Sequence, residues 1–555
     1  MSVLQISTYR LGNGRSNLRE SRESRLREGQ KNMSESVESS ASVISVGEAV
    51  SRHAAATPHK VAIAFEGRNT TFQKLDRAAN QVANGLIALG VDACDRVAIL
   101  DKNSDCYLEV WLGVSKLNAV IVPINARLAA PEVEYIVNDA KAKVLFIGEP
   151  FVAMIGEIRA RLTHVQKVIV INEDYGNWRD IQSPSDVRRP IASDDVCMQI
   201  YTSGTTGHPK GVQLTNGNTL DTMADTLAAW GNWNASDVAL SAMPLFHIAG
   251  CGVSLLSLVA GMKIVVVRDF LPAQIIELIQ TERITVTFLV PAMIMFLLDD
   301  KSIVGADLTS LRRIVYGASP IPSKLLQRAI QRFSSAGFLQ LYGLTETTGG
   351  ITLLTAEDHA DPESPRLKSC GRPLSGVDLR VVDADGNQVR EGEVGEIICR
   401  TVKNMKGYWN RDEDTARTLR NGWLYTGDAG YLDADGYLYI HDRVKDMIVS
   451  GGENIYPAEI ESAMFGHPSI ADVAVIGVPD ERWGEAVKAL VVLKPGTAAD
   501  TAATDILAYA RERLAGYKVP KSIDFADALP RNPTGKILKR ELREKYWKGF
   551  QRQVN

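Results

Sequence analysis

A ten-residue segment at 202–211 carries the residue types that bind phosphate. It reads Thr-Ser-Gly-Thr-Thr-Gly-His-Pro-Lys-Gly, and so combines four hydroxyl side chains, three glycines and one lysine. Glycines let backbone N–H groups approach an anion closely, hydroxyls add donors, and the lysine adds positive charge. The P-loop of kinases and GTPases has a hydroxyl residue after its lysine, whereas Gly211 follows Lys210 here. We therefore expect a phosphate-binding loop of another class, with a flexible Ser/Thr/Gly connection as the alternative.

Five further short motifs carry side chains suited to a nucleotide. They are Met-Pro-Leu-Phe-His at 243–247, Tyr-Gly-Leu-Thr-Glu at 342–346, Tyr-Thr-Gly-Asp at 425–428, Asp-Arg-Val-Lys-Asp at 442–446 leading into 450–461, and Asn-Pro-Thr-Gly-Lys at 532–536. Carboxylates such as Glu346 are hard oxygen ligands for divalent cations, and a carboxylate such as Asp428 can accept two hydrogen bonds.

The segments that must position these motifs have an α/β pattern. The run at 196–201 predicts a buried strand that ends at the 202–211 loop, and the segment 71–90 predicts a helix with Thr71 as its N-cap and Gly90 at its C-terminus. Similar strand-like runs recur between helical segments, at 61–65, 97–100, 120–122, 144–147, 168–171, 264–267, 286–290 and 314–316. This alternation predicts mainly parallel sheets covered on both faces, with ligands at the carboxyl ends of the strands.

Changes in composition and in turn motifs along the chain predict several domains. Residues 1–41 hold many arginines and serines and are expected to be a disordered extension, with Met33 as an alternative start. A large domain at 42–442 ends in a small antiparallel β module, marked by Asp-Ala-Asp-Gly turns at 383–386 and 433–436. A boundary at 443–446, a compact α+β domain at 447–545 and a basic tail at 546–555 are expected to follow.

Composition narrows the classes of function. The 555-residue chain is 45% hydrophobic and 23% charged, with a formal net charge of −4, which gives no reason to expect nucleic acid as a partner. Its six cysteines are dispersed without a C-x-x-C pair, which suits a reducing compartment better than disulfides or a zinc site. The run at 251–267 is interrupted by Gly261 and Lys263, and we expect a core helix and a strand there and no membrane span. These features predict a cytoplasmic enzyme.

The order of the six motifs resembles that of the AMP-forming adenylating superfamily, which contains acyl-CoA synthetases, adenylation domains of peptide synthetases and firefly luciferase. The resemblance covers about 45–545. It implies a two-step reaction in which a carboxylate attacks the α-phosphorus of ATP, releases pyrophosphate and forms an acyl-adenylate that a thiol then attacks. The carboxylate is already ionised at pH 7, so the enzyme must supply positive charge and aligned donors rather than a base.

The ATP-binding residues expected on this basis surround the phosphates, the ribose and the adenine. Glu346 suits Mg²⁺ with Thr202 as a weaker metal partner, Thr345 can bond the α-phosphate, and Asp428 with Arg443 can reach the ribose. The phosphate loop contributes Thr202, Ser203, Gly204, Thr205, Thr206, Gly207 and Lys210, and the adenine slot contributes Gly317, Ala318, Ser319, Tyr342 and Gly343.

The resemblance also assigns roles to the domains: it makes 42–442 the ATP- and acyl-binding domain, 443–446 a hinge and 447–545 a mobile lid domain. The lysine matching Lys536 bridges the carboxylate and the α-phosphate in the family, so the lid domain must close for adenylation and then rotate for the thiol. The family hinge maps onto Lys445, and Gly451 and Gly452 are expected to line the path of CoA. Two departures affect this hinge: the family often has Gly where Asp442 stands, and Asp is frequent where this chain has Lys445.

The acid substrate is the least determined part of the prediction. His247 is expected to gate the acyl pocket, with Cys251, Gly317 and Gly343 as further lining, and no cation for a second carboxylate is evident. The sequences at 436–440, 473–485 and 529–536 are most similar to those of bacterial medium- to long-chain fatty acyl-CoA synthetases. Aryl acids such as cinnamates or benzoates remain the alternative, as does a carrier protein in place of CoA.

The expected partners are therefore a hydrophobic carboxylic acid, Mg-ATP and CoA, with weak membrane contact of the basic tail and a homodimer as further hypotheses. The sequence fits two other classes of function less well. A phosphate-loop NTPase lacks support because Gly211 stands where a hydroxyl is required, and a non-catalytic nucleotide-binding regulator would not need both Glu346 and Lys536.

Overall fold

The computed structural model describes residues 45–187, 189–202, 209–443, 446–450, 453–480, 482–497, 499–531 and 537–548. Several predictions fall outside these residues. They concern the extension at 1–41, the loop residues Ser203, Gly204, Thr205, Thr206 and Gly207, the hinge residue Lys445, the glycines Gly451 and Gly452, and the catalytic candidate Lys536.

The largest sheet of the described residues has nine strands in the order β15-β14-β13-β12-β11-β9-β10-β1-β2. The strands from β13 to β1 are parallel, whereas β2, β14 and β15 pair antiparallel at the two edges. The bounds are β1 Val61–Phe65, β2 Arg68–Thr71, β9 Val238–Ser241, β10 Lys263–Val266, β11 Val286–Leu289, β12 Arg313–Gly317, β13 Gly337–Leu344, β14 Gly349–Leu354 and β15 Arg372–Pro373.

A second sheet has seven strands in the order β18-β8-β7-β4-β3-β5-β6. Its strands from β7 to β6 are parallel, and β8 and β18 extend it antiparallel. The bounds are β3 Arg96–Leu100, β4 Val120–Pro123, β5 Val144–Gly148, β6 Lys167–Ile171, β7 Val196–Thr202, β8 Lys210–Thr215 and β18 Gly407–Tyr408. The predicted mainly parallel α/β class is confirmed, with antiparallel strands added at the edges.

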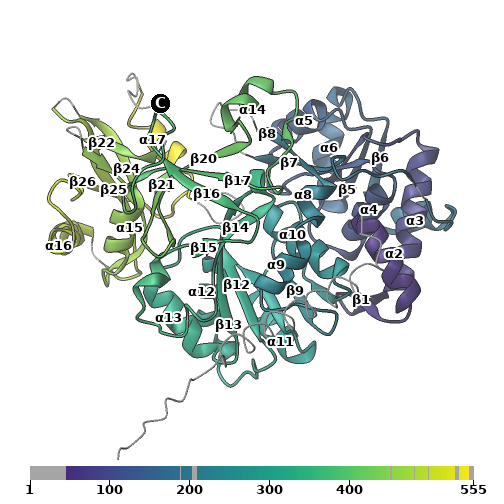
Figure 1. Cartoon of the computed structure of the whole chain (residues 1–555), viewed down its shortest axis with the longest axis horizontal. Coiled ribbons are helices and arrows are strands. Elements are labelled where there is room, and N and C mark those ends of the chain that lie inside the picture. Colours follow the sequence, from purple (N-terminus) through teal and green to yellow (C-terminus); the bar gives the residue numbers. More distant parts are fainter. Residues whose placement is uncertain are drawn as a thin grey trace, which may run out of the picture. The chain divides into compact units, whose positions relative to one another are not determined.

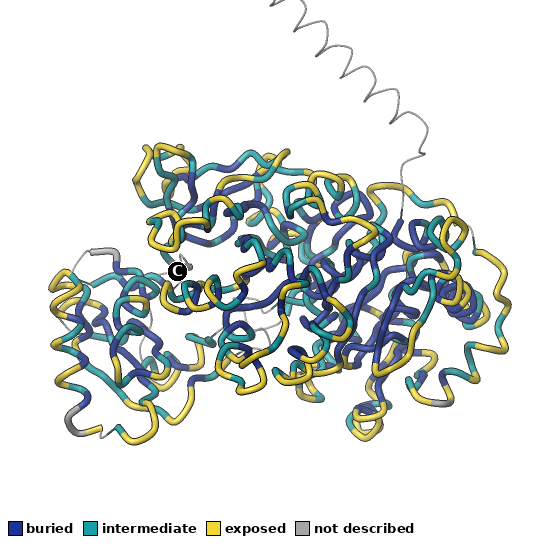
Figure 2. The backbone as a smooth tube through the Cα atoms, turned by 90° about the horizontal axis from the view of Figure 1, so that it is seen from below, coloured by how far each residue is buried: buried dark blue, intermediate teal, exposed yellow. Residues whose placement is uncertain are grey.

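Helices alternate with these strands because their apolar faces must be buried against the sheets. In Figure 1, α2, α3 and α4 lie side by side, and α3 begins after Thr71, whose hydroxyl accepts a hydrogen bond from Lys74 N as an N-cap. The helices of this part are α2 Val46–Ala56, α3 Phe72–Ala88, α4 Asp105–Lys116, α5 Ala130–Asp139, α6 Val152–Ile158, α7 Glu173–Asp180, α8 Asn216–Leu220, α9 Met223–Ala229, α10 Ile248–Val259, α11 Pro272–Thr281, α12 Pro291–Asp299 and α13 Ser323–Arg332. Figure 2 shows that buried residues follow the strands and exposed residues the turns.

The chain then forms the expected antiparallel β module. Strands β16 (Asp378–Val382), β17 (Gly395–Arg400), β20 (Trp423–Leu432) and β19 (Leu419–Arg420) form one sheet, in which β21 (Leu438–Arg443) also pairs with β20. The turn at 433–436 joins β20 to β21 as predicted, and α14 (Asp412–Thr418) precedes β19.

The C-terminal part has its own sheet and its own hydrophobic core. Strand β24 pairs antiparallel with β25 over its whole length, and residues such as Ile460, Val475 and Ile506 are fully buried around this pair. The elements are β22 Ile448–Ser450, β23 Glu453–Ile455, α15 Pro457–Phe465, β24 Ile470–Asp480, β25 Gly484–Leu493, α16 Ala499–Arg511, β26 Ser522–Phe525 and α17 Lys539–Glu544. The indole of Trp547 donates a hydrogen bond to Gly477 O at 2.9 Å, so this tail residue is attached to β24.

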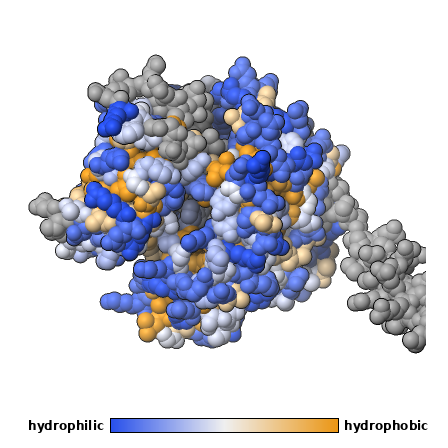
Figure 3. All heavy atoms as spheres, turned by 60° about the vertical axis from the view of Figure 1, so that its left-hand side comes forward, coloured by the Kyte–Doolittle hydropathy of each residue, from blue (hydrophilic) through white to orange (hydrophobic). Residues whose placement is uncertain are grey.

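The surface of the described residues is largely polar. Figure 3 shows a face that is mostly hydrophilic, with hydrophobic side chains in separate groups between the polar ones. None of the helices within the described residues combines the length and the apolar character needed to cross a membrane.

Both large sheets change from parallel to antiparallel pairing next to a predicted nucleotide motif. Strand β7 leads into the 202–211 segment before returning as β8, with Thr202 opposite Lys210. Strand β13 ends at the 342–346 motif, turns through the 3₁₀ helix η4 (Thr345–Thr347) and returns as β14. Strand β8 packs beside η4, so the fold brings the two motifs together although they are far apart in the chain.

Candidate active site

Asp428 and Tyr342, predicted to bind ribose and adenine, are in direct contact. The Tyr342 hydroxyl at the end of β13 donates a hydrogen bond to Asp428 Oδ2 at 2.7 Å. Asp428 is 6% exposed, and its backbone N–H bonds the Thr426 hydroxyl. A buried carboxylate with a fixed donor has a defined orientation, which a ribose-binding group needs. In the sheet register Asp428 lies opposite Arg443, whose side chain is outside the described part of the structure.

Glu346, the expected metal ligand, is held from two sides by the segment after β17. The Tyr408 hydroxyl donates a hydrogen bond to Glu346 Oε1 at 3.0 Å, and Met405 N bonds the Glu346 backbone carbonyl at 2.8 Å. The adjacent Thr345 is buried, and Thr348 closes η4 with a positive φ of 50°. Such left-handed conformations in non-glycine residues persist where the surroundings enforce them. The geometry therefore fixes the backbone on both sides of the Glu346 carboxylate.

Lys210 is paired with a carboxylate that the sequence reading did not single out. Its Nζ lies 3.0 Å from Asp414 Oδ1 on α14 and 5.2 Å from the centre of the Tyr408 ring. Arg417 also bonds Asp414, and both cations hold the pKa of that carboxyl below its usual value against the opposing effect of burial. The ammonium of Lys210 is thus held in place at the end of β8, next to the predicted phosphate loop.

The segment 401–418 is the main functional region that the sequence reading missed. It provides Tyr408 to Glu346 and Asp414 to Lys210, and it joins the antiparallel β module to the edge of the seven-stranded sheet. Its Gly-Tyr-Trp-Asn sequence carries two aromatic residues between polar ones, which alone does not distinguish a positioning role from ordinary packing.

The predicted adenine slot lies at the ends of β12 and β13. Gly317 pairs with Leu341 so closely that a Cβ at position 317 would lie 2.2 Å from Leu341 O. Ala318 follows in a left-handed conformation with φ of 66°, and Ser319 comes next at the same strand end. Small residues and a strained turn leave this edge of the sheet open beside Tyr342.

A mostly apolar cavity adjoins this edge. Two predicted pocket residues, His247 and Gly343, line it together with Ala318 of the adenine slot. Its other lining residues include several from α8, α9 and α10, those around the start of β14, and Lys403 from the segment between β17 and β18: Asn218, Met223, Trp230, Val253, Leu256, Val259, Thr348, Gly349, Gly350 and Lys403. The fold therefore joins an apolar chamber to the residues expected to hold the nucleotide.

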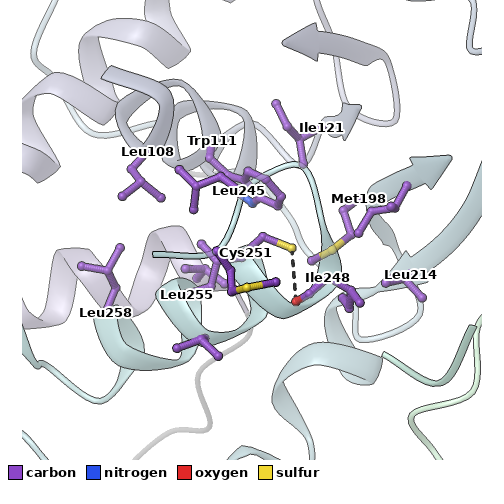
Figure 4. Close-up of a cluster of buried hydrophobic side chains, with 14 of the residues drawn as sticks. Leu108, Trp111, Ile121, Met198, Leu214, Leu245, Ile248, Cys251, Leu255 and Leu258 are labelled. Atoms are coloured by element: carbon purple, nitrogen blue, oxygen red, sulfur yellow. Dashed lines mark hydrogen bonds between the residues drawn. The ribbon is translucent and has the colours of Figure 1, made fainter. Parts of the chain in front are cut away.

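Cys251 and Gly317, also predicted to line the acyl pocket, are not among the residues that line this cavity. Cys251 is fully buried in the core, where Figure 4 shows it beside Ile248, Met198 and Leu255. Burial raises the pKa of its thiol to about 12. Ile248, Met198 and Leu255 line the cavity themselves, so Cys251 packs behind residues that line it.

His247 caps α10 at the mouth of the same cavity. Its Nδ1 accepts a hydrogen bond from Ala249 N at 3.3 Å, so the ring is fixed at the helix N-terminus. Partial burial lowers the pKa of His247 to about 4, because desolvation disfavours the charged form of the ring. A neutral imidazole therefore lines the cavity at pH 7.

Lys403 corrects the expectation that this cavity has no cation. The residue is 6% exposed, lines the cavity, and donates a hydrogen bond from Nζ to Gly350 O at 2.6 Å. Burial lowers the pKa of Lys403 to about 8, which leaves the ammonium mainly protonated at pH 7. No motif marked this lysine, because it comes from a segment distant in sequence from the helices that build the chamber.

The donors present fit a magnesium ion bound with ATP. In proteins Mg²⁺ is held by one or two carboxylates together with substrate phosphates and water. Glu346 is such a carboxylate, and Thr202 at the end of β7 has a hydroxyl and pairs with Lys210 of β8, the strand that packs beside η4. Among the described residues no group of three or more His, Cys, Asp or Glu side chains could hold a metal without substrate.

The chain matches the model of the AMP-binding enzymes over residues 50–409 and the model of the AMP-binding enzyme C-terminal domain over residues 459–536. The chain belongs to the AMP-binding enzyme family. This family accounts for the order of the motifs and for the two-part architecture, with the cavity and the β7 and β13 motifs in the large AMP-binding part and the β24–β25 sheet in the C-terminal domain.

Relatives in the AMP-binding family differ in the acid they use and in the acceptor. The chain is 39% identical over 508 residues to a fatty acid–[acyl-carrier-protein] ligase of Streptomyces coeruleorubidus, covering 91% of this chain and 96% of the relative. It is 40% identical over 497 residues to a feruloyl-CoA synthase of Amycolatopsis, covering 89% and 98%. A solved Mycobacterium tuberculosis fatty acyl CoA synthetase shares 36% identity and a TM-score of 0.74, covering 92% and 99%.

Proposed function

We propose that the chain activates a hydrophobic carboxylic acid, in the first place a medium- to long-chain fatty acid, and transfers the acyl group to CoA with release of AMP and pyrophosphate. AMP-forming acid ligation follows from the family, whereas the choice of a fatty acid and of CoA is our proposal. The observation that carries it is the apolar cavity, which reaches Ala318 and Gly343 next to the nucleotide residues.

The lining of the cavity supports a hydrocarbon substrate. The apolar lining includes residues of α9, its C-cap and α10, namely Met223, Trp230, Val253, Leu256 and Val259. Each methylene group moved from water to such a lining stabilises the complex by about 0.8 kcal/mol. His247 is compatible with this lining, because its ring is neutral at pH 7.

The residues of the nucleotide side would work by orientation and charge. Asp428, held by Tyr342, would accept hydrogen bonds from the ribose, while Lys210 and the 202–211 loop would hold the departing pyrophosphate. Glu346 and Thr202 would hold Mg²⁺, which neutralises phosphate charge when it is bound. Lys536 would bridge the carboxylate and the α-phosphate, and the C-terminal domain would rotate about Lys445 to open the path past Gly451 and Gly452 for CoA.

Product analysis with a panel of acids tests this proposal. The protein is incubated with ATP, Mg²⁺, CoA and straight-chain acids of increasing length, and AMP, ADP and acyl-CoA are measured by chromatography and mass spectrometry. We expect acid-dependent AMP and acyl-CoA, with kcat/KM rising with chain length. Formation of ADP, or no acid-dependent AMP with any acid, contradicts the proposal.

An aryl acid is the second candidate because an aromatic side chain lies in the cavity wall and a feruloyl-CoA synthase is among the relatives. Trp230 lines the cavity, as does Phe288 at the end of β11. Aromatic rings pack favourably against other rings in offset or edge-to-face arrangements. Cinnamates and benzoates therefore belong in the same panel, and a kcat/KM above that of every straight-chain acid would favour this candidate.

The acceptor is tested in the same reaction. A fatty acid–carrier-protein ligase among the relatives makes a phosphopantetheinylated acyl carrier protein the alternative to CoA. Both carry the same terminal thiol, so the comparison is made with CoA and with loaded carrier protein at equal concentrations. Acyl transfer to the carrier protein alone would overturn the choice of CoA and leave AMP-forming activation intact.

A further inference from the structure

Lys403 occupies an unusual position for a lysine. Buried ammonium groups cost free energy unless they are paired, and lysine is rarely found fully inside a protein without a partner. Here the side chain is 6% exposed, and the hydrogen bond described for Nζ goes to a neutral acceptor, the carbonyl of Gly350. Within the described residues no carboxylate lies within ion-pair distance of Lys403.

The segment that carries Lys403 is fixed by three side-chain hydrogen bonds. Asn218 Nδ2 donates to Val402 O at 2.7 Å and to Asn404 O at 3.0 Å, and Thr348 Oγ1 donates to Lys403 O at 2.7 Å. Asn218 and Thr348 themselves line the cavity. Lys403 is therefore held at the wall by residues of the chamber rather than by surface contacts.

The ammonium lies next to the chamber itself. Nζ is 2.6 Å from the oxygen of Gly350, and both Lys403 and Gly350 line the cavity. Gly350 pairs with Gly343 in the register of β13 and β14, and Gly343 lines the cavity too. An ammonium carries three N–H donors, of which the Gly350 carbonyl takes one, so it can donate to a further acceptor.

We infer that Lys403 recognises a hydrogen-bond-accepting oxygen of the acid other than the reacting carboxylate, and so selects oxygen-bearing acids over plain hydrocarbon acids of the same length. This inference rests on the proposed function of the cavity as the acyl site. A second carboxylate gains most, because it pairs with the buried charge, and a hydroxyl or carbonyl oxygen gains less.

The test compares two homologous series, straight-chain monocarboxylic acids and α,ω-dicarboxylic acids of four to about ten carbons, chosen so that every distance between the two ends is sampled. The wild-type protein, Lys403→Met and Lys403→Gln are assayed for acid-dependent AMP formation. Methionine keeps most of the side-chain length without the charge, and glutamine keeps a neutral N–H donor on a side chain one atom shorter. Lys406→Met removes an exposed lysine of the same segment and serves as the matched control.

In the wild type we expect at least one dicarboxylic acid to exceed its monocarboxylic counterpart in kcat/KM by about 10- to 100-fold. This is the range that one hydrogen bond to a charged group contributes. Lys403→Met should abolish that preference, Lys403→Gln should reduce it, and Lys406→Met should keep it. An unchanged preference in Lys403→Met, equal losses for both series, or no preference at any length in the wild type overturns the inference.

Direct binding separates this inference from the proposed function. Isothermal titration of the wild type and Lys403→Gln with the same two series, in the presence of a non-hydrolysable ATP analogue, measures recognition without turnover. Tighter binding of a dicarboxylic acid that depends on Lys403 supports the inference even if no acid yields AMP. If AMP forms and neither binding nor turnover depends on Lys403, the inference fails while the proposed function stands.

Discussion

The titratable groups on the nucleotide side of the site and those in the cavity have different kinds of hydrogen-bond partner. On the nucleotide side the charged side chains have side-chain partners: Asp428 has Tyr342, Glu346 has Tyr408, and Lys210 has Asp414. In the cavity the titratable groups bond the backbone, His247 through Ala249 N and Lys403 through Gly350 O. Burial then lowers the pKa of both cavity groups.

The proposed function explains this difference by two kinds of ligand. ATP and its phosphates are constant, so a preorganised network can hold each charged group where it is needed in every reaction cycle. The acid would be bound by shape and by a small number of polar groups whose partners arrive with it. Substitutions on the nucleotide side should therefore affect all acids equally, whereas substitutions in the cavity should change the response to particular acids or to pH.

The largest expected effect is that of Lys536→Ala. Removal of a charge aimed at the transition state should lower acid-dependent exchange between ATP and pyrophosphate by about 10²- to 10³-fold, equally for all acids. Attack of CoA on supplied acyl-adenylate should fall much less. The control is Lys521→Ala, an exposed lysine of the C-terminal part. Equal losses in the two half-reactions would contradict the assignment of Lys536 to the first step.

Asp428→Asn should come next. An amide offers the ribose one acceptor in place of a carboxylate, and we expect kcat/KM for ATP to fall by about 10- to 100-fold, since hydrogen bonds to charged groups contribute roughly 1.5–3 kcal/mol. Tyr342→Phe keeps the ring but loses the bond to Asp428 and should cost less. Steady-state kinetics with two acids of different length measure both variants. A loss that differs between the acids would break the separation of the two regions.

Acidification should lower the stability of the folded protein through His247, the half-buried histidine of the cavity. The folded-state pKa of His247 is about 4, so between about pH 6.5 and pH 4 the unfolded chain binds a proton that the folded chain rejects. Its contribution to stability is therefore complete above pH 6.5 and falls by about 2 kcal/mol by pH 5.

Urea unfolding of the wild type and of His247→Asn from pH 7 to pH 5 measures this effect. Asparagine can still accept the bond that caps α10 but does not titrate, so the variant should lose less stability across this range. His164→Gln changes an exposed histidine instead and is the matched control. The same dependence on pH in His247→Asn and in the wild type would show that the ring is solvated.

The smallest expected effect is that of Tyr408→Phe. Without the hydroxyl, Glu346 loses one hydrogen bond that orients its carboxylate, and the Mg²⁺ concentration for half-maximal activity should rise about 3- to 10-fold, the range of one ordinary hydrogen bond. Tyr431→Phe, a tyrosine of β20 stacked on Tyr439, is the control. A lower requirement for Mg²⁺ would mean that the hydroxyl competes with the metal instead of orienting its ligand.

The sequence predicted the fold well for physical reasons, whereas the roles of the nucleotide residues stay predictions. The strand-like runs, the N-cap at Thr71 and the turn at 433–436 depend on local patterns, and the structure has them where they were expected. The residues predicted at Tyr342 and Asp428 lie in contact, although no local pattern could show that their side chains bond each other. Phosphate chemistry requires fixed residue types in short motifs, which is why these positions are readable.

The acyl cavity was harder to predict because packing over long distances in the chain builds it. Of Cys251 and Val253 on α10, only Val253 lines the cavity, although Ile248 and Leu255 beside Cys251 also line it, so the packing of the folded chain decides which residues reach it. Lys403 comes from a segment that sequence alone does not connect to α10, and its contact with Gly350 exists only in the folded chain. The positions of Lys536, Lys445, Gly451 and Gly452 remain predictions.

The segment 401–418 has a consequence for the engineering and evolution of this protein. One short stretch of backbone carries Lys403 at the acyl cavity and, a few residues later, Tyr408 and Asp414 at the nucleotide side. A chimera that exchanges this stretch for that of a relative would transplant a determinant of acid choice together with the supports of Glu346 and Lys210. A crossover within this stretch would separate Lys403 from Tyr408 and Asp414, so chimeras should keep the stretch intact. Substrate range is better altered by single replacements at position 403.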